Sequence, residues 1–204
     1  MTEWSEKFAA VGRYYDNLVA RHGHSPFACD YGRPESQQIK FSVLAEVMPL
    51  SGKSILDVGC GFADYADYLE QKFTRVSYSG VDLSAAMVEG ARKHRPDRSI
   101  RRLDILQDEP GRYDVVTANG IFYLLGSKAA PLMRRIVTRM FELSREAVAF
   151  NSLSAWAVDH EAGEFYADPL QTVDFCRTLT PWVVLRHDYH HRDFTIFMYR
   201  ERRG

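Results

Sequence analysis

The sequence predicts an α/β fold in which a doubly wound, mostly parallel sheet ends in an antiparallel hairpin. From residue 54 to residue 151, short apolar segments of strand type alternate with segments in which apolar residues recur every three or four positions. This alternation is typical of a parallel sheet covered by helices on both faces. Near the C-terminus, apolar segments at 182–189 and 194–200 are separated only by a His-His-Arg-Asp turn, which predicts the hairpin.

The length and the net charge of the chain restrict the domain organisation and the classes of binding partner. The chain has 204 residues, with 26 Lys and Arg against 27 Asp and Glu and a formal net charge of −1. This length suits a single domain over 1–204, and the near-neutral charge argues against nucleic acid or an anionic membrane as a partner. Because the cysteines are widely spaced and the first residues lack a signal-peptide core, we expect a cytoplasmic protein without a membrane span.

The first 50 residues predict a helical lid, followed by an α/β core over 51–204. An amphipathic helix is predicted where apolar residues recur at steps of three and four, at Trp4, Phe8, Val11, Tyr15 and Leu18. Residues 22–34 are rich in turn formers and predict an irregular loop. A second helix is predicted at 35–48, with Ile39, Val43 and Val47 on one face, and the residues 49–53 end it.

The core elements follow in order. Strands are predicted at 55–58, 76–81, 99–103, 113–118 and 146–151. Helices are predicted from Tyr65 through Leu69 to Phe73, and at 84–94, 129–143 and 169–179.

The segment ILDVGCGFADY, residues 55–65, is the most informative part of the sequence. Gly59 and Gly61 follow a buried strand directly, where residues without Cβ allow a tight turn and let a ligand lie against the backbone. The dinucleotide-binding pattern would place Gly or Ala at position 64, but Asp64 is there. A pyrophosphate-containing cofactor therefore fits this turn poorly.

Acidic residues end the next two predicted strands. Asp82 is at the tip of the second strand, where a carboxylate accepts hydrogen bonds from both ribose hydroxyls. Asp104 ends the third strand, within reach of an exocyclic amine, and Met87 offers an apolar surface for a base. Together these residues predict a site for an adenosine without a pyrophosphate.

The pattern of a glycine turn, a ribose acid, an adenine acid and a fourth-strand aspartate resembles the class I S-adenosylmethionine-dependent methyltransferases over residues 54–151. The resemblance implies S-adenosylmethionine as cofactor and transfer of its methyl group to a small molecule. It assigns Asp57, Gly59 and Gly61 to the methionine part and Asp82 to the ribose. It assigns the adenine to Leu83, Met87, Asp104 and Ile105. Ala63 departs from the third glycine of many members.

Candidates for the acceptor side come from three segments. Asn119 and Gly120, at the tip of the fourth strand, form the floor of the predicted crevice, and Asn119 is a candidate for both cofactor and acceptor contact. The other candidates lie in the lid, at the tip of the fifth strand and at the start of the hairpin: Tyr14, Tyr15, Asp30, Arg33, Gln37, Asn151, Ser152, Ser154, His187, Asp188 and Tyr189.

Methyl transfer to a protic acceptor needs a base, and His187 beside Asp188 is the first candidate. Its structural alternative is a hydrogen-bonded histidine at a strand end. Tyr15 is a second catalytic candidate, with core packing as its alternative. The floor lacks the Asn-Pro-Pro-Tyr or Asp-Pro-Pro-Tyr pattern of amide and exocyclic-amine methyltransferases, which argues against such acceptors.

Two other functions remain open at this point. An RNA methyltransferase would use the arginine runs at 92–102 and 200–203, and a nucleoside-binding module would keep the pocket without turnover. Cys60 is interpreted as a small buried side chain and Asp114 as a structural anchor. The acidic segment 159–164 lacks metal-ligand spacing, so we expect a solvated loop and no metal. The sequence does not define the acceptor atom or the oligomeric state.

Overall fold

The computed structural model describes residues 4–30 and 33–203. Its longer helices are α1 (Ser5–His22), α2 (Pro34–Ala45), α3 (Asp64–Lys72), α4 (Ala85–His94), α5 (Ala129–Leu143) and α6 (Pro169–Arg177). Short 3-10 turns are η1 (Pro26–Cys29) and η2 (Gly126–Lys128). The strands are β1 (Ser54–Val58), β2 (Ser77–Asp82), β3 (Ser99–Arg102), β4 (Tyr113–Ala118), β5 (Ser144–Leu153), β6 (Val183–Arg186) and β7 (Asp193–Tyr199).

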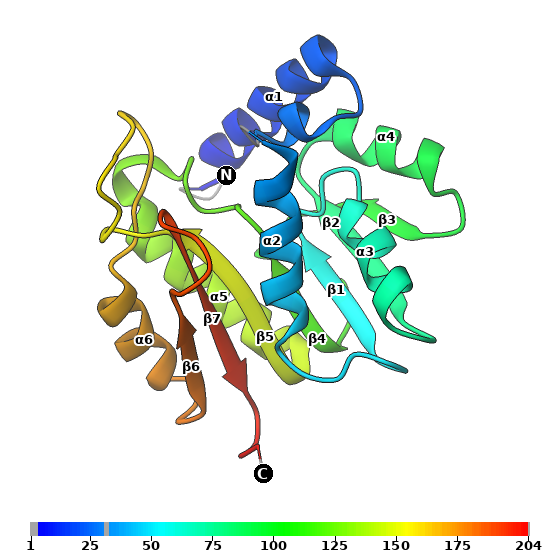
Figure 1. Cartoon of the computed structure of the whole chain (residues 1–204). Coiled ribbons are helices and arrows are strands. Elements are labelled where there is room, and N and C mark those ends of the chain that lie inside the picture. Colours follow the sequence, from blue (N-terminus) through cyan, green and yellow to red (C-terminus); the bar gives the residue numbers. More distant parts are fainter. Residues whose placement is uncertain (1–3, 31–32, 204) are drawn as a thin grey trace.

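The strands form one seven-stranded sheet in the order β3-β2-β1-β4-β5-β7-β6 (Figure 1). Neighbouring strands from β3 to β5 are parallel, whereas β7 is antiparallel to both β5 and β6. The chain order reverses between β1 and β4, which leaves a crevice at the carboxyl ends of these strands. The predicted parallel sheet with a terminal antiparallel hairpin is confirmed.

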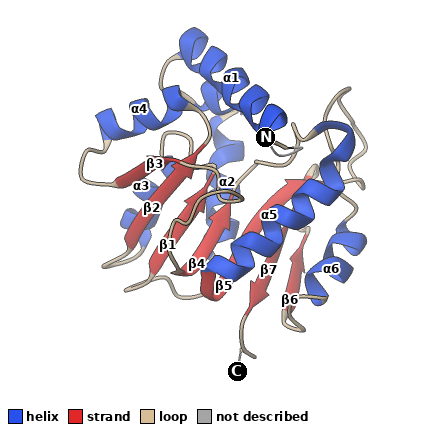
Figure 2. Cartoon of the chain, turned by 180° about the vertical axis from the view of Figure 1, so that it is seen from behind, coloured by secondary structure: helices blue, strands red, loops and turns tan. Residues whose placement is uncertain are grey.

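The core lies on both faces of the sheet. Apolar residues of α2, α3 and α4 pack in one cluster with the sheet, and those of α5 and α6 pack in the other. Figure 2 shows α5 and α6 crossing the second face. Inner strand residues such as Leu56, Val116 and Phe150 are fully buried, as expected for strands covered on both sides. Among the described residues, no helix has the length and hydrophobicity needed to cross a bilayer.

The N-terminal helix α1 lies across the carboxyl ends of the strands (Figure 1). A Cβ on Gly12 would lie 3.2 Å from the backbone oxygen of Leu83, so glycine allows α1 to approach the loop after β2 closely. The carboxylate of Asp16 accepts hydrogen bonds from the Ser84 hydroxyl at 2.6 Å and the Ala86 amide at 3.0 Å. These bonds hold α1 against the start of α4, and in this position α1 covers the crevice.

Several expectations about the lid and the hairpin need correction. The second helix ends at Ala45 rather than 48, and Ile39 is 36% exposed while Val43 and Val47 are buried. One face of this helix packs in the core, and its residues Gln37, Lys40 and Phe41 also line the crevice at the strand ends. The strand expected at 182–189 is paired only over Val183–Arg186, and the next residue, His187, has its Nε2 atom 2.7 Å from the Ser154 hydroxyl. Residues 1–3 and 31–32 of the predicted lid lie outside the described residues.

Candidate functional site

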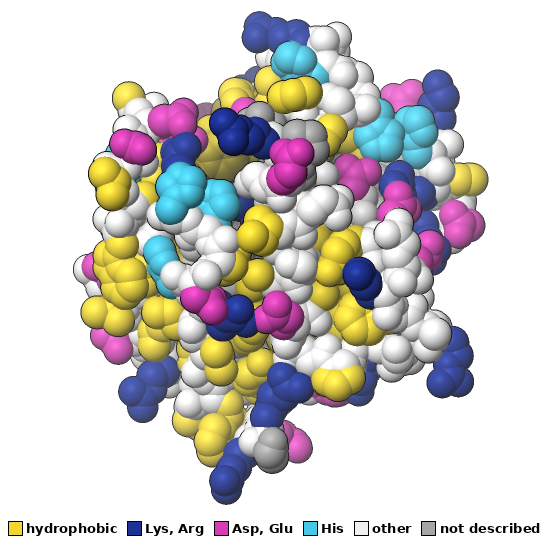
Figure 3. All heavy atoms as spheres, in the orientation of Figure 1, with side chains coloured by type: hydrophobic (Ala, Val, Ile, Leu, Met, Phe, Trp, Pro, Cys, Tyr) yellow, Lys and Arg dark blue, Asp and Glu magenta, His cyan; other side chains and the backbone are white. Residues whose placement is uncertain are grey.

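A cavity of about 880 Å³ occupies the crevice at the carboxyl ends of the parallel strands. Its walls come from α1, η1, α2, the loops after β1 to β5, and the turn before β7. Figure 3 shows a hollow near the top of the molecule, bordered by basic, acidic and histidine side chains. The volume lies within the usual range for a cofactor and a small ligand.

The glycine turn after β1 forms part of the cavity wall. Gly59, Gly61 and Ala63 all have positive φ, at 71°, 54° and 62°. The amides of Gly59 and Cys60 donate to the Val81 oxygen at 2.8 and 3.1 Å, so the turn is held against the end of β2. A Cβ on Gly59 would lie 2.3 Å from the Ile121 side chain. The turn thus needs glycine at 59 for both its backbone conformation and its packing.

Asp82 is the last residue of β2 and lines the same wall. Its carboxylate accepts hydrogen bonds from the backbone amides of Gly61 and Ser84, both at 2.9 Å. Burial raises the pKa of Asp82, and these hydrogen bonds oppose that shift. The acid therefore connects the glycine turn to the start of α4. Leu83 and Met87 continue the wall beside it.

Asp57 is buried beneath the turn, with 3% of its surface exposed, and also lines the cavity. Its carboxylate accepts hydrogen bonds from the Tyr78 hydroxyl at 2.7 Å and the Thr117 hydroxyl at 3.0 Å. Burial raises the pKa of Asp57 to about 7, although both hydrogen bonds favour the ionised form. Because no cationic side chain of the described residues pairs with it, this acid suits a positively charged ligand group.

Asp104 and Ile105 line the cavity beyond β3. The carboxylate of Asp104 also accepts from the Leu106 amide at 2.9 Å and the Gln107 side-chain amide at 2.6 Å. Asp104 thus stabilises the turn at residues 104–107, in which it lies. Each carboxylate oxygen retains a further lone pair, so these bonds leave Asp104 able to accept from a ligand amine.

Asn119 and Asn151 lock the end of β4 to β5. Asn119 accepts from the Asn151 side chain at 2.6 Å, and Asn151 accepts from the Gly120 amide at 2.6 Å. The Nδ2 atom of Asn119 is buried and has no hydrogen-bond acceptor within the described chain, and Asn119 lines the cavity. A buried donor without an acceptor indicates that a ligand oxygen fits here.

A tyrosine cluster joins the lid to the core. The Asp30 carboxylate accepts from the hydroxyls of Tyr14 at 2.8 Å and Tyr123 at 2.6 Å, and the Tyr123 hydroxyl lies 2.9 Å from that of Tyr15. Burial raises the pKa of both Tyr15 and Tyr123, which keeps these phenols protonated. Tyr15, a predicted catalytic residue, lines the cavity as part of this latch.

We expect Asp30→Asn to weaken this latch without changing its shape. Asp30 has φ 59°, a conformation that Asn tolerates, so the substitution removes mainly the charge that strengthens both hydrogen bonds. The dissociation rate constant of S-adenosylhomocysteine should rise about threefold to tenfold, measured by stopped-flow fluorescence. Asp97→Asn, on the exposed surface, is the control, and equal rates in the two variants would contradict a latch.

The structure brings only some of the predicted acceptor residues to the cavity. Tyr14, Tyr15, Asp30, Arg33, Gln37, Asn119 and Ser152 line it. Asn151, Ser154, His187, Asp188 and Tyr189 are not among the lining residues. The Nε2 atom of His187 lies 2.7 Å from the Ser154 hydroxyl, and its ring packs near Trp156. Asp188 pairs with Arg186 instead of His187.

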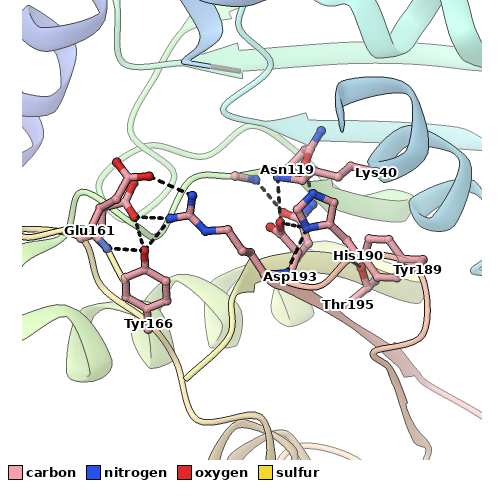
Figure 4. Close-up of polar contacts among 12 residues, drawn as sticks. Lys40, Asn119, Glu161, Tyr166, Tyr189, His190, Asp193 and Thr195 are labelled. Carbon is pink, nitrogen blue, oxygen red and sulfur yellow. Dashed lines mark hydrogen bonds and ion pairs between the residues drawn. The ribbon is translucent and has the colours of Figure 1, made fainter. Parts of the chain in front are cut away.

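The histidines that reach the cavity are His190 and His191, in the turn before β7. Figure 4 shows His190 beside Asp193, near Lys40 and Asn119. Asp193 is 2% exposed, and its carboxylate lies 2.8 Å from Nδ1 of His190 and 3.1 Å from Nζ of Lys40. Burial raises the pKa of Asp193, but these contacts outweigh it and lower the pKa overall.

Arg192 and its partners form a second polar cluster, beside the cluster of His190, Asp193 and Lys40. Arg192 pairs with Glu161 at 2.8 Å and with Glu164 at 2.9 Å, and it donates to the Tyr166 hydroxyl at 2.6 Å (Figure 4). The segment expected to be a solvated acidic loop thus supplies two of its acids to the cavity wall. The sequence predicts only a turn at the His-His-Arg-Asp segment, because the partners of Arg192 and Asp193 are far away in the chain.

Comparisons with known proteins agree with this geometry. Residues 56–145 match a family model described as a methyltransferase domain. A Mycobacterium tuberculosis protein that carries the name of a methyltransferase is 28% identical over 71% of this chain and 92% of its own length. The trans-aconitate 2-methyltransferase of Afipia carboxidovorans is 30% identical over 39% of this chain and 32% of its own length.

Solved structures share the fold. The magnesium protoporphyrin IX methyltransferase of Synechocystis PCC 6803, crystallised with S-adenosylhomocysteine, superposes with a TM-score of 0.73 at 15% identity, covering 95% of this chain and 99% of that one. The matched segment runs from within β1 to the start of β5 and includes the glycine turn, Asp82 and Asp104. Residues 56–145 are thus a methyltransferase domain, and the chain is similar in sequence and in fold to methyltransferases.

Proposed function

We propose that the enzyme transfers the methyl group of S-adenosylmethionine to a small molecule held within the covered cavity. The observation that carries this proposal is the latch formed by Asp30, Tyr15 and Tyr123, which closes the lid over the cavity. A covered cavity of about 880 Å³ suits the donor together with a small acceptor better than a polymer strand.

The arginines of the first run support a small acceptor over RNA, because they serve the fold. Arg92, Arg101 and Arg102 donate to backbone oxygens, whereas Arg95 and Arg98 pair with acids of α3. At the C-terminus, Arg200 and Arg203 also bond backbone oxygens. Arg95 and Arg98 are thus neutralised by acids and the other arginines named are held against the fold, which disfavours a phosphate-binding surface here.

The residues present fit the donor. We assign the ribose to Asp82, the methionine part to Asp57, Gly59 and Gly61, and the ammonium group to the uncompensated charge of Asp57. The adenine is assigned to the wall formed by Leu83, Met87, Asp104 and Ile105. The buried Nδ2 of Asn119 is available to an oxygen of the donor or the acceptor.

When bound, S-adenosylmethionine supplies an activated methyl group that is displaced from sulfur in line with the attacking atom. The protein then mainly holds the acceptor close to this carbon and keeps water out. Tyr15 and Tyr123 contribute to the closed wall above the cavity, and Asp82 fixes the orientation of the donor.

Isothermal titration with S-adenosylhomocysteine tests the donor site. Asp82→Ala removes the ribose acceptor and the carboxylate that holds the Gly61 and Ser84 amides, so we expect affinity to fall at least about tenfold. Asp97→Ala is the surface control and should bind like the wild type. Unchanged affinity in Asp82→Ala would remove the assignment.

A labelling experiment tests the acceptor class. A bacterial lysate is incubated with the enzyme and S-adenosylmethionine tritiated at the methyl group, then separated into small-molecule, RNA and protein fractions. We expect enzyme-dependent label in the small-molecule fraction. Label confined to RNA or protein, or absent from every fraction, would contradict the proposal.

A further inference from the structure

We propose that His190 is the general base of the transfer reaction and that Asp193 is its positioning residue. The inference rests on the proposed function and adds to it the chemical class of the acceptor, a hydroxyl, phenol or protonated amine that must lose a proton. The step is the removal of that proton by Nε2 of His190.

The geometry provides a held imidazole with one free nitrogen. Nδ1 of His190 lies 2.8 Å from the Asp193 carboxylate and 3.2 Å from the backbone nitrogen of Arg192, whose N–H points toward it. Nε2 has no hydrogen-bond partner within the described residues, and His190 lines the cavity. One nitrogen is thus fixed by the protein while the other remains available to an acceptor.

Two contacts compete for Nδ1 of His190. The backbone N–H of Arg192 points at Nδ1 from 3.2 Å and favours a lone pair there. The Asp193 carboxylate is closer, at 2.8 Å, and its contacts lower the pKa of Asp193, so it is an ionised group that can only accept a hydrogen bond. Because a charged partner outweighs a neutral amide, we place the proton of neutral His190 on Nδ1, which leaves the lone pair on Nε2.

The surroundings of this pair suit a base that gains charge during the reaction. Asp193 comes from β7 and is buried, so its negative charge stabilises an imidazolium beside it. Lys40, from α2, pairs with the same carboxylate, and the ring of His191 stacks on that of His190 with centroids 4.8 Å apart.

In the proposed step one bond to carbon forms and one breaks. The acceptor oxygen or nitrogen forms a bond to the methyl carbon while the carbon–sulfur bond of the donor breaks, and sulfur keeps that electron pair. The acceptor proton goes to Nε2 of His190 and later leaves to solvent. The products are the methylated acceptor, S-adenosylhomocysteine and one proton. An acceptor that attacks through a thioether sulfur has no proton to lose and would not need this base.

Nitrogen-15 NMR of histidine-labelled protein saturated with S-adenosylhomocysteine tests the geometry without any acceptor. With the resonances assigned by means of His190→Asn, neutral His190 should carry its proton on Nδ1, and Asp193→Asn should reduce that tautomer. A neutral His190 protonated on Nε2 in the wild type would overturn the proposal, whether or not an acceptor is known.

Initial rates of label transfer to the small-molecule fraction of the lysate test the catalytic role. His190→Asn should lower the rate about 100-fold or more, whereas His187→Asn, outside the cavity, should change it by no more than about twofold. Added imidazole should restore part of the activity of His190→Ala. Asp193→Asn should lower the rate at least about tenfold, with unchanged titration by S-adenosylhomocysteine showing that the fold is intact.

Different results would contradict the small-molecule function and the role of His190 as the base. Wild-type protein that labels RNA or protein alone would remove the small-molecule function, whereas the NMR result would still decide the tautomer of His190. Full activity in His190→Asn with label in small molecules would remove the base and leave the proposed function standing.

Discussion

Replacing Gly59 by alanine is expected to lower the free energy of unfolding by about 3 kcal/mol. The backbone there has φ 71°, which costs a residue with a Cβ about 1 kcal/mol or more. The added methyl would lie 2.3 Å from Cγ2 of Ile121, so Ile121 or the turn has to move. Because this turn also forms the donor wall, affinity for S-adenosylhomocysteine should fall with stability.

Gly52→Ala is the matched control for this substitution. Gly52 has φ 78°, close to that of Gly59, but a Cβ there would meet nothing within 4 Å. We expect Gly52→Ala to lower the free energy of unfolding by about 1 kcal/mol, the cost of a Cβ at positive φ. It should leave the affinity for S-adenosylhomocysteine unchanged. Urea unfolding followed by circular dichroism gives both stabilities, and isothermal titration gives both affinities. Equal losses in the two variants would show that contact with Ile121 is not the cause.

The free protein is expected to lose stability between about pH 4 and pH 7 because of Asp57. The pKa of this acid rises from 3.8 to about 7 in the folded state. Over that interval the unfolded chain releases the proton while the folded chain retains it, so the free energy of unfolding falls as pH rises. At 1.36 kcal/mol per pH unit, the loss approaches about 4 kcal/mol above pH 7.

Two variants separate this effect from the other acids. Asp57→Asn should flatten the decline, as measured by urea unfolding over the same pH range. Asp114→Asn should leave the decline between pH 4 and pH 7 unchanged. Hydrogen bonds from Ser54 lower the pKa of Asp114 despite partial burial, so its contribution to stability is lost only as pH falls below about 4. A wild-type profile identical to that of Asp57→Asn would contradict the assignment.

The fold and the donor half of the site could be predicted because their signals are local. The glycine turn and Asp82 each directly follow or end an apolar strand, and parallel topology alone brings the ends of β1 and β2 together. Periodicity failed where packing depends on distant partners, as at Ile39, which lies in a helical pattern but outside the buried face.

The acceptor half could not be predicted for the same reason. Asp193 meets Lys40 from α2, and Arg192 meets Glu161 from the loop after β5, so their contacts span most of the chain. The hairpin contains several histidines, and no local pattern separates His187, which bonds Ser154, from His190, which lines the cavity. The sequence shows an aspartate three residues after His190, and only the structure shows that this aspartate is buried.

A crystal structure with S-adenosylhomocysteine bound would locate the donor site. We expect the ribose hydroxyls within hydrogen-bond distance of Asp82, the adenine between Met87 and Ile105, and the amino acid part along Gly59 and Gly61. A ligand bound elsewhere in the chain, with the cavity beside Asp82 filled by protein side chains, would contradict this assignment.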